Sequence, residues 1–315
     1  MPAASRYLTW LSSVLVPPRR EARPGDGSAR AVLGYATGYT AADLMPFVRS
    51  LRAVFDGEIV LTVDDRPDIA ALFAEHRVTA ARPLNAEGWA PHPVMERFAA
   101  YDAWLAAHPD VGQVLLTDVR DVIFQSDPFA RPARTLEVFI ESEGATLADH
   151  AFDQKYLKAL AGRDVAALVS DQPCLCVGTV FGPVAAVRRL CKAILLLAAV
   201  PRSRIGGIFG ADQAGCNLAV HLGLVEADIR PNYDRVATIG DRAAPSLRAD
   251  GLIVNPDGSA SPVVHQYDRH PILAEAVRQR WGAPRDVAVK GRTKSPSDRI
   301  RRMLVSLTLR LPEFR

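Results

Sequence analysis

Short apolar runs and helical stripes alternate along the first part of the chain. Apolar runs typical of buried strands cover residues 31–36, 58–63, 76–81 and 111–116. The segments between them repeat apolar residues at helical spacing, most clearly over 41–55, 67–75 and 93–107. This β-α-β-α-β-α-β order predicts a largely parallel sheet with helices on both faces.

The remainder of the chain is patterned less regularly. We expect strands over 136–140, 174–181, 224–229, 252–254 and 263–266, and helices over 184–199, 212–222 and 272–281. Residues 17–30 are rich in Pro, Gly and charge, which indicates a linker. The sequence therefore predicts an N-terminal segment and linker (1–30), one α/β domain (31–284) and a C-terminal tail (285–315).

The segment after the fourth expected strand is the one most suggestive of chemistry. An apolar strand leads into Asp118 and Asp121, and a second apolar patch over 122–124 follows at once. Ligand sites in α/β sheets lie beyond the carboxyl ends of the strands. Two carboxylates at such an end suit Mg²⁺ or Mn²⁺, which fill their remaining positions with water and substrate phosphate oxygens.

With the Asp127-Pro128 that follows, this segment resembles the D-x-D region of GT-A glycosyltransferases. The resemblance implies a GT-A-like, Rossmann-like mixed and mostly parallel sheet flanked by helices. It also implies that Asp121 binds a divalent metal and that Asp118 contacts the metal or the ribose of a nucleotide-sugar. The spacing departs from the family pattern, because two residues rather than one separate the acids and one of them is Arg120. That arginine is expected to contact a phosphate or to pair with an acid.

The same resemblance assigns a nucleotide-sugar site to five further positions or their neighbours. Thr37 and Tyr39 follow the first strand, where the family contacts ribose or base, and Asp64 follows the second, where an acid often receives a hydrogen bond from the base. Arg97 is expected to reach the diphosphate, and Gly178 to permit close approach of the donor sugar. Turn formation or surface solvation would explain several of these residues equally well.

Two later segments complete the expected site. Asp212 and Gln213 open a helix and resemble the family's Asp-Gln segment, which implies a catalytic or sugar-orienting role. An N-terminal helix cap is the alternative for Asp212. His265 follows an apolar pair late in the chain, where many GT-A enzymes place their last metal ligand.

Charge is distributed unevenly along the chain. The net charge is +3, yet residues 285–315 hold nine Lys or Arg and three acidic residues. The remainder has no basic excess, so no nucleic-acid partner is expected. Over 298–314 the tail repeats apolar residues at helical spacing, a pattern that suits either peripheral contact with an anionic membrane or packing on the domain or a partner.

Cysteine usage and hydropathy bear on the expected location. The four cysteines show no zinc-knuckle or disulfide pattern and are expected to be reduced core thiols, which favours the cytoplasm. No apolar run reaches the roughly 20 residues of a membrane span. A location at the inner face of the membrane would suit the basic tail.

These features predict a metal-dependent transferase that moves a sugar from a nucleotide-diphosphate donor to a hydroxyl of a glycan or other acceptor, in glycan or envelope polysaccharide synthesis. A sugar-phosphate nucleotidyltransferase, or another metal-dependent nucleotide enzyme, is one alternative. It is disfavoured because residues 34–40 lack the basic residues expected of its Gly-rich loop. A non-catalytic binding module on the same fold is the other alternative.

Overall fold

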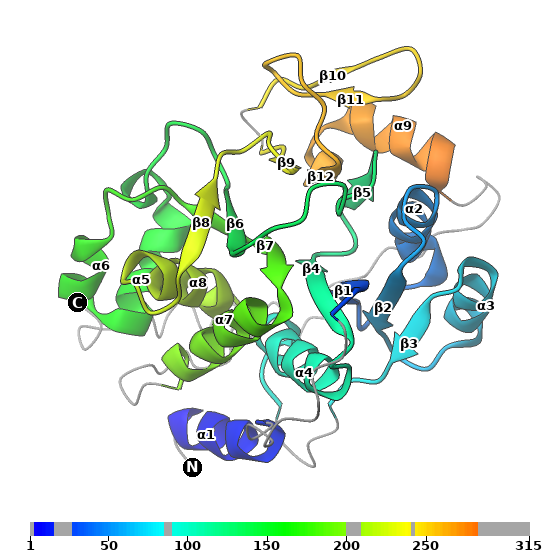
Figure 1. Ribbon diagram of the computed structural model, residues 1–315. Helices are drawn as coiled ribbons and strands as arrows, with labels where there is room; N and C mark the ends of the chain where they lie inside the picture. Colours follow the sequence, from blue (N-terminus) through cyan, green and yellow to red (C-terminus); the bar gives the residue numbers. More distant parts are fainter. Residues whose placement is uncertain (1–2, 16–26, 85–89, 200–208, 241–242, 283–315) are drawn as a thin grey trace, which may run out of the picture.

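The computed structural model describes residues 3–15, 27–84, 90–199, 209–240 and 243–282. Within them a seven-stranded mixed sheet has the spatial order β3-β2-β1-β4-β7-β6-β8 (Figure 1). Its strands are β1 (Ala29–Tyr35), β2 (Glu58–Thr62), β3 (Thr79–Ala81), β4 (Val111–Thr117), β6 (Leu136–Ile140), β7 (Leu175–Pro183) and β8 (Ala227–Arg230). The tail 285–315, and with it the predicted amphipathic helix, lies outside the described residues.

Strand β7 runs against its neighbours β4 and β6, while the other pairs in this sheet of the described chain are parallel. The predicted mixed, mostly parallel sheet is therefore confirmed. One edge of the sheet collects the carboxyl ends of six strands together with the amino end of β7. This shared edge is where segments distant in the sequence meet.

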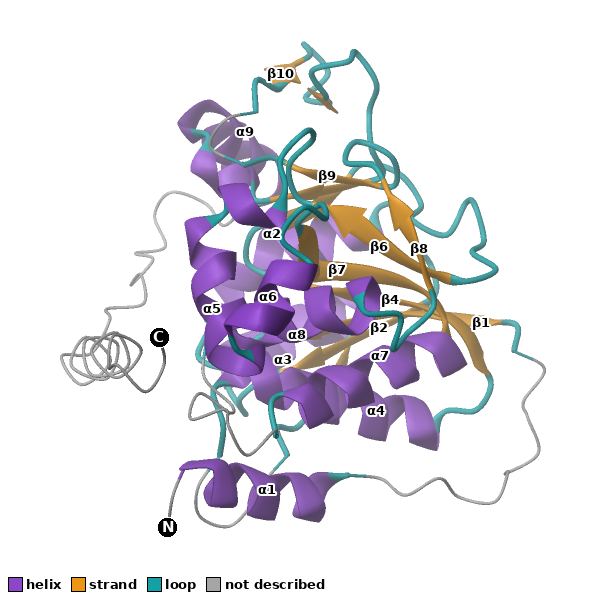
Figure 2. Ribbon diagram, turned by 90° about the vertical axis from the view of Figure 1, so that its left-hand side faces the viewer, coloured by secondary structure: helices purple, strands orange, loops and turns teal. Residues whose placement is uncertain are grey.

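Alternation along the strands gives the sheet two buried faces. In β1, Ala31 and Leu33 pack into one core and Val32 into the other, and β4 repeats the pattern with Val114, Leu115 and Leu116. Successive side chains of a strand point to opposite faces, so apolar residues at consecutive positions are buried on both sides. Helices accordingly cover both faces (Figure 2).

The two faces carry different helices. One core includes side chains from α1 (Ala3–Val14), α4 (Pro93–Ala107), α5 (Ala151–Ala161), α6 (Arg163–Leu168), α7 (Val184–Leu197) and α8 (Ala211–His221). The opposite core includes side chains from α2 (Ala41–Arg52) and α3 (Pro67–His76). At the start of α2, Thr40 and Asp43 form a reciprocal capping box.

The N-terminal segment contributes to the core. Tyr7, Trp10 and Leu11 of α1 are buried, and the Tyr7 hydroxyl donates to the carbonyl of Leu195 in α7 at 2.9 Å. Figure 1 and Figure 2 both place α1 beneath α4 and α7. The apolar stripe of this segment is thus covered by the domain itself.

A second, smaller sheet lies beside the main one. In the described part it has three strands in the order β5-β12-β9, formed by Val122–Phe124, Val263–His265 and Val236–Thr238. Helix α9 (Pro271–Trp281) packs on it through Leu273 and Val277. Two further short strands, β10 (Ser246–Leu247) and β11 (Ile253–Val254), pair with each other, and the 3-10 turns are η1 (Leu147–Asp149) and η2 (Tyr267–Arg269).

Some sequence-based boundaries were wrong. The strand expected from residue 76 begins at Thr79, because α3 continues through His76 and ends at Arg77, whose φ of 53° is left-handed. The strand expected from residue 224 begins at Ala227. Helices α5 and α6 had not been predicted.

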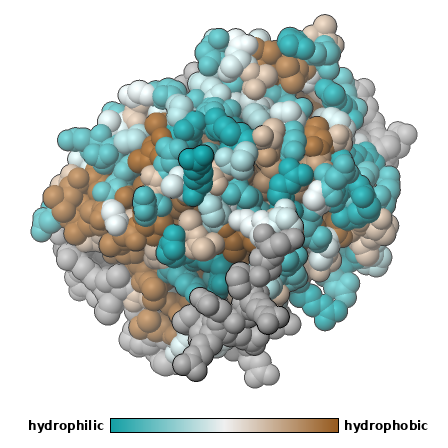
Figure 3. Space-filling model, viewed as in Figure 1, coloured by the Kyte–Doolittle hydropathy of each residue, from teal (hydrophilic) through white to brown (hydrophobic). Residues whose placement is uncertain are grey.

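The outer surface has an uneven hydropathy. Figure 3 shows hydrophobic residues gathered on the side that α5 and α6 occupy in Figure 1, and hydrophilic residues over much of the centre. Phe152 of α5 and Leu168 of α6 are exposed. No helix among the described residues is long and apolar enough to cross a membrane.

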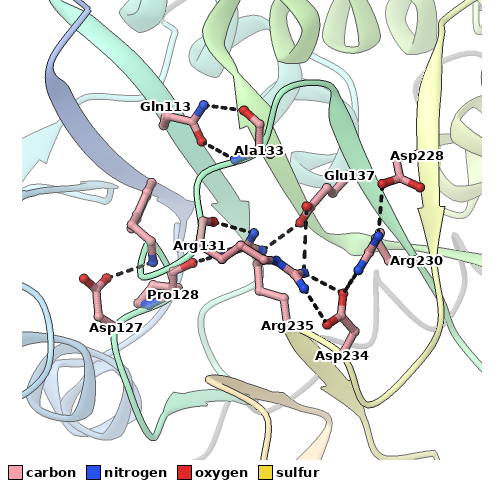
Figure 4. Close-up of polar contacts among 11 residues, drawn as sticks. Gln113, Asp127, Pro128, Arg131, Ala133, Glu137, Asp228, Arg230, Asp234 and Arg235 are labelled. Atoms are coloured by element: carbon pink, nitrogen blue, oxygen red, sulfur yellow. Dashed lines mark hydrogen bonds and ion pairs between the residues drawn. The ribbon is translucent and has the colours of Figure 1, made fainter.

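A buried ion pair joins β6 to the segment before β9. The Arg235 guanidinium donates to Glu137 at 2.8 Å and to the carbonyls of Pro128 and Arg131, and it stacks over Phe181 at 3.8 Å. Figure 4 shows Arg131 and Arg230 converging on Asp234 beside this pair. The network fixes the loop before β6 against the chain that enters the small sheet.

We expect Arg235→Met to lower the free energy of unfolding by about 3–5 kcal/mol, because it removes the buried cation of Glu137 and leaves this carboxylate only the half-exposed Arg131, 3.8 Å away. The double variant Arg235→Met with Glu137→Gln should recover part of that loss. Urea unfolding measures both. Arg248→Met, which removes an exposed partner of Asp250, is the control and should leave the midpoint unchanged. An Arg235 variant as stable as the wild type would contradict the stabilising role of this ion pair.

Candidate functional site

The two acids of the sequence motif lie in the connection between the two sheets. Asp118 directly follows β4, and Asp121 directly precedes β5. The Asp118 amide donates to the carbonyl of Gly178 at 2.6 Å, which extends the β4–β7 ladder by one residue. The backbone of β7 therefore fixes the position of Asp118.

His265 reaches the acids because of strand pairing in the small sheet. Strand β12 runs antiparallel to β5, and its last residue, His265, pairs with Val122, the residue after Asp121. The next amide, that of Gln266, donates to the carbonyl of Asp121 at 2.8 Å. The predicted late histidine is thus placed beside the predicted acidic motif.

The three side chains form a compact donor set. His265 Nε2 lies 3.5 Å from Asp118 Oδ2 and 3.9 Å from Asp121 Oδ2, and one donor atom from each residue lies within 4.8 Å of the others. A Cβ on Gly178 would meet Asp118 Oδ2 at 2.8 Å and His265 Cε1 at 2.6 Å, so only glycine leaves room for this arrangement.

This set fits a divalent cation. Carboxylate oxygens are the donors that Mg²⁺ and Mn²⁺ prefer, and an imidazole ligand favours the transition metal Mn²⁺ over Mg²⁺. Three protein ligands leave further coordination positions for water or substrate oxygens. The described residues thus contain the donors that the resemblance assigned to the metal.

A buried arginine links the acidic motif to helix α8. Arg97 of α4 is 8% exposed and binds Asp118 through Nη1 and Asp212 through Nη2, the latter at 2.8 Å. Asp212 is 6% exposed, and Gly210 rather than Asp212 holds the N-cap position of α8. The predicted diphosphate-binding arginine is therefore engaged by two carboxylates, and the alternative of a helix cap for Asp212 is not what the structure has.

The charges of these groups shift one another's titration. Burial alone would raise the pKa of Asp118, but the charges of Arg97 and His265 outweigh it and hold that pKa well below its usual range. Burial raises the pKa of Asp121, against the charge of His265. Burial opposes the charged form of His265, yet Cys176 and the two carboxylates keep its pKa well above the ordinary value.

The residues expected to contact the nucleotide lie at the same sheet edge, on neighbouring strands. Thr37 and Tyr39 follow β1, and Asp64 follows β2. Asp64 accepts a hydrogen bond from the Gly38 amide at 2.5 Å, which ties the two loops together. Tyr39 lies close enough to Arg120 to influence its pKa. None of these residues belongs to the donor set of Asp118, Asp121 and His265.

Gln213 makes its side-chain hydrogen bonds outside the set of Asp118, Asp121 and His265. Its amide nitrogen donates to Glu141 Oε2 at 2.7 Å, and its oxygen accepts from the Val177 amide at 3.2 Å.

Sequence reasoning missed Glu141, which follows β6 at the same edge as Asp118. It also missed Cys176, whose Sγ lies 3.5 Å from His265 Nδ1. Cys176 is two positions from Gly178 on β7, so the two residues lie on the same face of the strand. That spacing was the sequence signal that could have identified Cys176.

Arg120, between the two acids, pairs with Asp268 at 3.1 Å. Its side chain is 56% exposed, so this pair contributes little stability in water. The pairing with an acid that was expected for Arg120 is therefore present, and its contact with a phosphate stays a prediction. The Tyr267 hydroxyl also donates to the Arg120 carbonyl at 3.4 Å, which joins η2 to this loop.

Comparison with protein-family models and with curated proteins finds no match to this chain.

We expect Arg97→Met to destabilise the fold near pH 7 by about 3–5 kcal/mol, chiefly because it leaves the buried Asp212 carboxylate without a cation; Asp118 is 35% exposed and keeps His265 as a partner. The low pKa of Asp118 stabilises the folded wild type above the unfolded pKa of about 3.9, and this stabilisation is lost as pH falls through the folded value. In the variant both carboxyl pKa values rise, so folding becomes less favourable as pH increases.

The deficit of the variant should therefore shrink between about pH 7 and about pH 5, as measured by urea unfolding at both values. Arg120→Met, which removes an exposed arginine from the same region, is the control and should change stability only slightly at either pH. An equal deficit for Arg97→Met at both pH values would contradict this electrostatic role.

Proposed function

We propose that this chain is a metal-dependent glycosyltransferase of the GT-A type, which moves a sugar from a nucleotide-diphosphate donor to an acceptor hydroxyl. One observation carries the proposal. Asp118 and Asp121, which follow the fourth strand of the parallel unit, meet His265 from the far end of the domain. The meeting point lies at the carboxyl edge of the strands, where α/β sheets bind their ligands.

Asp118, Asp121 and His265 are the residues that would hold the metal, Mn²⁺ or Mg²⁺. When bound, such an ion neutralises the negative charge that builds on a departing diphosphate. The chain itself keeps Asp118 ionised through Arg97, so this ligand is available at neutral pH. The Asp121 side chain is 18% exposed, and burial raises its pKa against the charge of His265; a bound divalent cation would favour its ionised form.

Asp212 acts in this proposal as a positioning residue. Its carboxylate receives a hydrogen bond from Arg97, and the other arm of Arg97 binds Asp118, so Asp212 orients the metal ligand through the guanidinium. A direct contact of Asp212 with the donor sugar stays a prediction. Gln213 would act one step further away, through Glu141 and the backbone of β7.

Thr37, Tyr39 and Asp64 would contact the ribose and base of the donor. Thr37 and Tyr39 follow β1, which neighbours β4 in the sheet, and Asp64 follows β2, on the other side of β1; all three therefore lie at the sheet edge where β4 ends. The glycan acceptor, the role in envelope polysaccharide synthesis and the peripheral membrane contact of the tail are proposals of the same kind. Buried, free cysteines suit the proposed cytoplasmic location.

A thermal-shift screen of the full chain against nucleotide-sugars, with and without Mn²⁺, tests the donor site. A donor at about 100 times its Kd should add about 2.7 kcal/mol of stability, and only when Mn²⁺ is present. Asp121→Asn should abolish the shift, whereas Asp250→Asn, which changes an exposed acid on the β10–β11 hairpin, should retain it. No metal-dependent shift from any donor would contradict the proposal, and a shift without sugar transfer would favour the binding module.

Gly178→Ala tests the metal site without changing a ligand. The added methyl would lie within 3 Å of Asp118 Oδ2 and His265 Cε1, so the donors must separate. We expect Mn²⁺ affinity to fall by roughly ten- to hundredfold, as for other changes in the support of metal ligands. Calorimetric titration with Mn²⁺ measures it.

Gly240→Ala is the matched control for that experiment. A Cβ at Gly240 meets nothing within 4 Å, and its φ is not in the left-handed region, so Mn²⁺ affinity should stay at the wild-type value. Equal affinities of the two alanine variants would remove the support for a metal at Asp118 and His265.

A further inference from the structure

A second group of metal-type donors lies where β6 ends and β7 begins. Glu141 directly follows β6, Cys174 directly precedes β7, and the Glu141 amide donates to the Cys174 carbonyl at 2.8 Å. His150 occupies the N-cap position of α5, and Asp153 lies one turn later on that helix. One donor atom from each of the four residues lies within 4.8 Å of all the others.

The spacing of these atoms matches a tetrahedral ligand set. Cys174 Sγ lies 3.5 Å from Glu141 Oε2, and His150 Nδ1 lies 3.6 Å from Asp153 Oδ2. Around Zn²⁺, with bonds of about 2.0–2.3 Å, neighbouring ligand atoms of a tetrahedron are roughly 3.3–3.8 Å apart. Both measured pairs fall in that range.

One oxygen of the buried Asp153 carboxylate has no hydrogen-bond partner. This oxygen is Oδ1, and the residue is 3% exposed. Among the ion pairs of the described residues, neither Asp153 nor Glu141 is joined to a lysine or arginine. Burial, and after it the charge of Glu141, raises the pKa of Asp153 to about 6. Two neighbouring carboxylates without a full cation are costly in a protein interior.

We propose that Glu141, His150, Asp153 and Cys174 form a second divalent-metal site, with the ligand set of Zn²⁺. A thiolate, an imidazole and two carboxylates supply four donors, which is the number that closed structural zinc sites use. The thiolate distinguishes this site from the Asp118–Asp121–His265 set, because sulfur selects zinc over magnesium or manganese. On binding, the Cys174 S–H bond breaks, the S–Zn bond forms and the proton passes to solvent.

The surroundings of the cluster support its ligands. Gln213 donates to Glu141 and accepts from the Val177 amide, so it fixes the Glu141 carboxylate against β7. Partners of this kind orient metal ligands from outside the coordination shell. A metal bound at this site would hold the start of α5 against the carboxyl end of β6 and the amino end of β7. It does not depend on the proposed transferase activity.

Cobalt substitution of the metal-stripped full chain tests the site, because a thiolate bound to Co²⁺ gives a near-ultraviolet charge-transfer band. We expect the wild type to develop this band on titration with Co²⁺ and to lose it when Zn²⁺ is added. Cys174→Ser should lack the band. Asp153→Asn should weaken Zn²⁺ binding by more than the roughly ten- to hundredfold that the loss of an outer partner costs.

Three control variants separate this site from the first one. Cys176→Ser removes the thiol beside His265, Cys191→Ser removes a buried thiol elsewhere, and Asp121→Asn disables the first site; all three should keep the band. Far-ultraviolet circular dichroism confirms folding of each variant. The proposal is overturned if the folded wild type shows no band, if the band survives Cys174→Ser, or if Cys176→Ser abolishes it.

Discussion

The site depends on one buried cation, the guanidinium of Arg97. Helix α4 delivers it beneath the carboxyl end of β4, where it binds Asp118 and Asp212 at once. The buried Asp212 carboxylate would be costly without it, because burial disfavours the charged form, and the charge of Arg97 also lowers the pKa of the partly exposed Asp118. A single side chain therefore connects α4, the acidic loop and α8. Together with His265, it keeps Asp118 ionised beside Asp121.

The reversed strand β7 is the second element on which the arrangement rests. Its amino end lies at the edge where the parallel strands end, so it adds its own residues to the site. At this end the chain carries Cys174, Cys176 and Gly178 at alternate positions. Cys174 lies in the four-residue cluster, Cys176 contacts His265, and Gly178 leaves room for the three-residue set. One strand thus borders both candidate metal sites.

Helix α8 couples the two sites through adjacent residues. Asp212 binds Arg97 and through it touches the first site, while Gln213 binds Glu141 of the second. Neighbouring residues at the start of a helix point in different directions, about 100° apart, which explains how one turn serves both. The Asp-Gln pair was singled out from sequence as a catalytic element. Its contacts make it the link between two carboxylate clusters.

The sequence by itself determined the parallel β-α units of the first half, because the periodicities of strands and helices are local patterns. A run of apolar residues indicates that those same residues are buried. It also identified Asp118, Asp121 and His265 as candidates, since each lies beside an apolar run and the segments resemble those of GT-A glycosyltransferases. Only the tertiary structure decided that they meet, because the antiparallel register of β12 on β5 sets His265 beside Asp121. The cluster of Glu141, His150, Asp153 and Cys174 was likewise invisible in sequence. Its members join only when β6, β7 and α5 pack, and strand pairing depends on partners far along the chain rather than on local pattern.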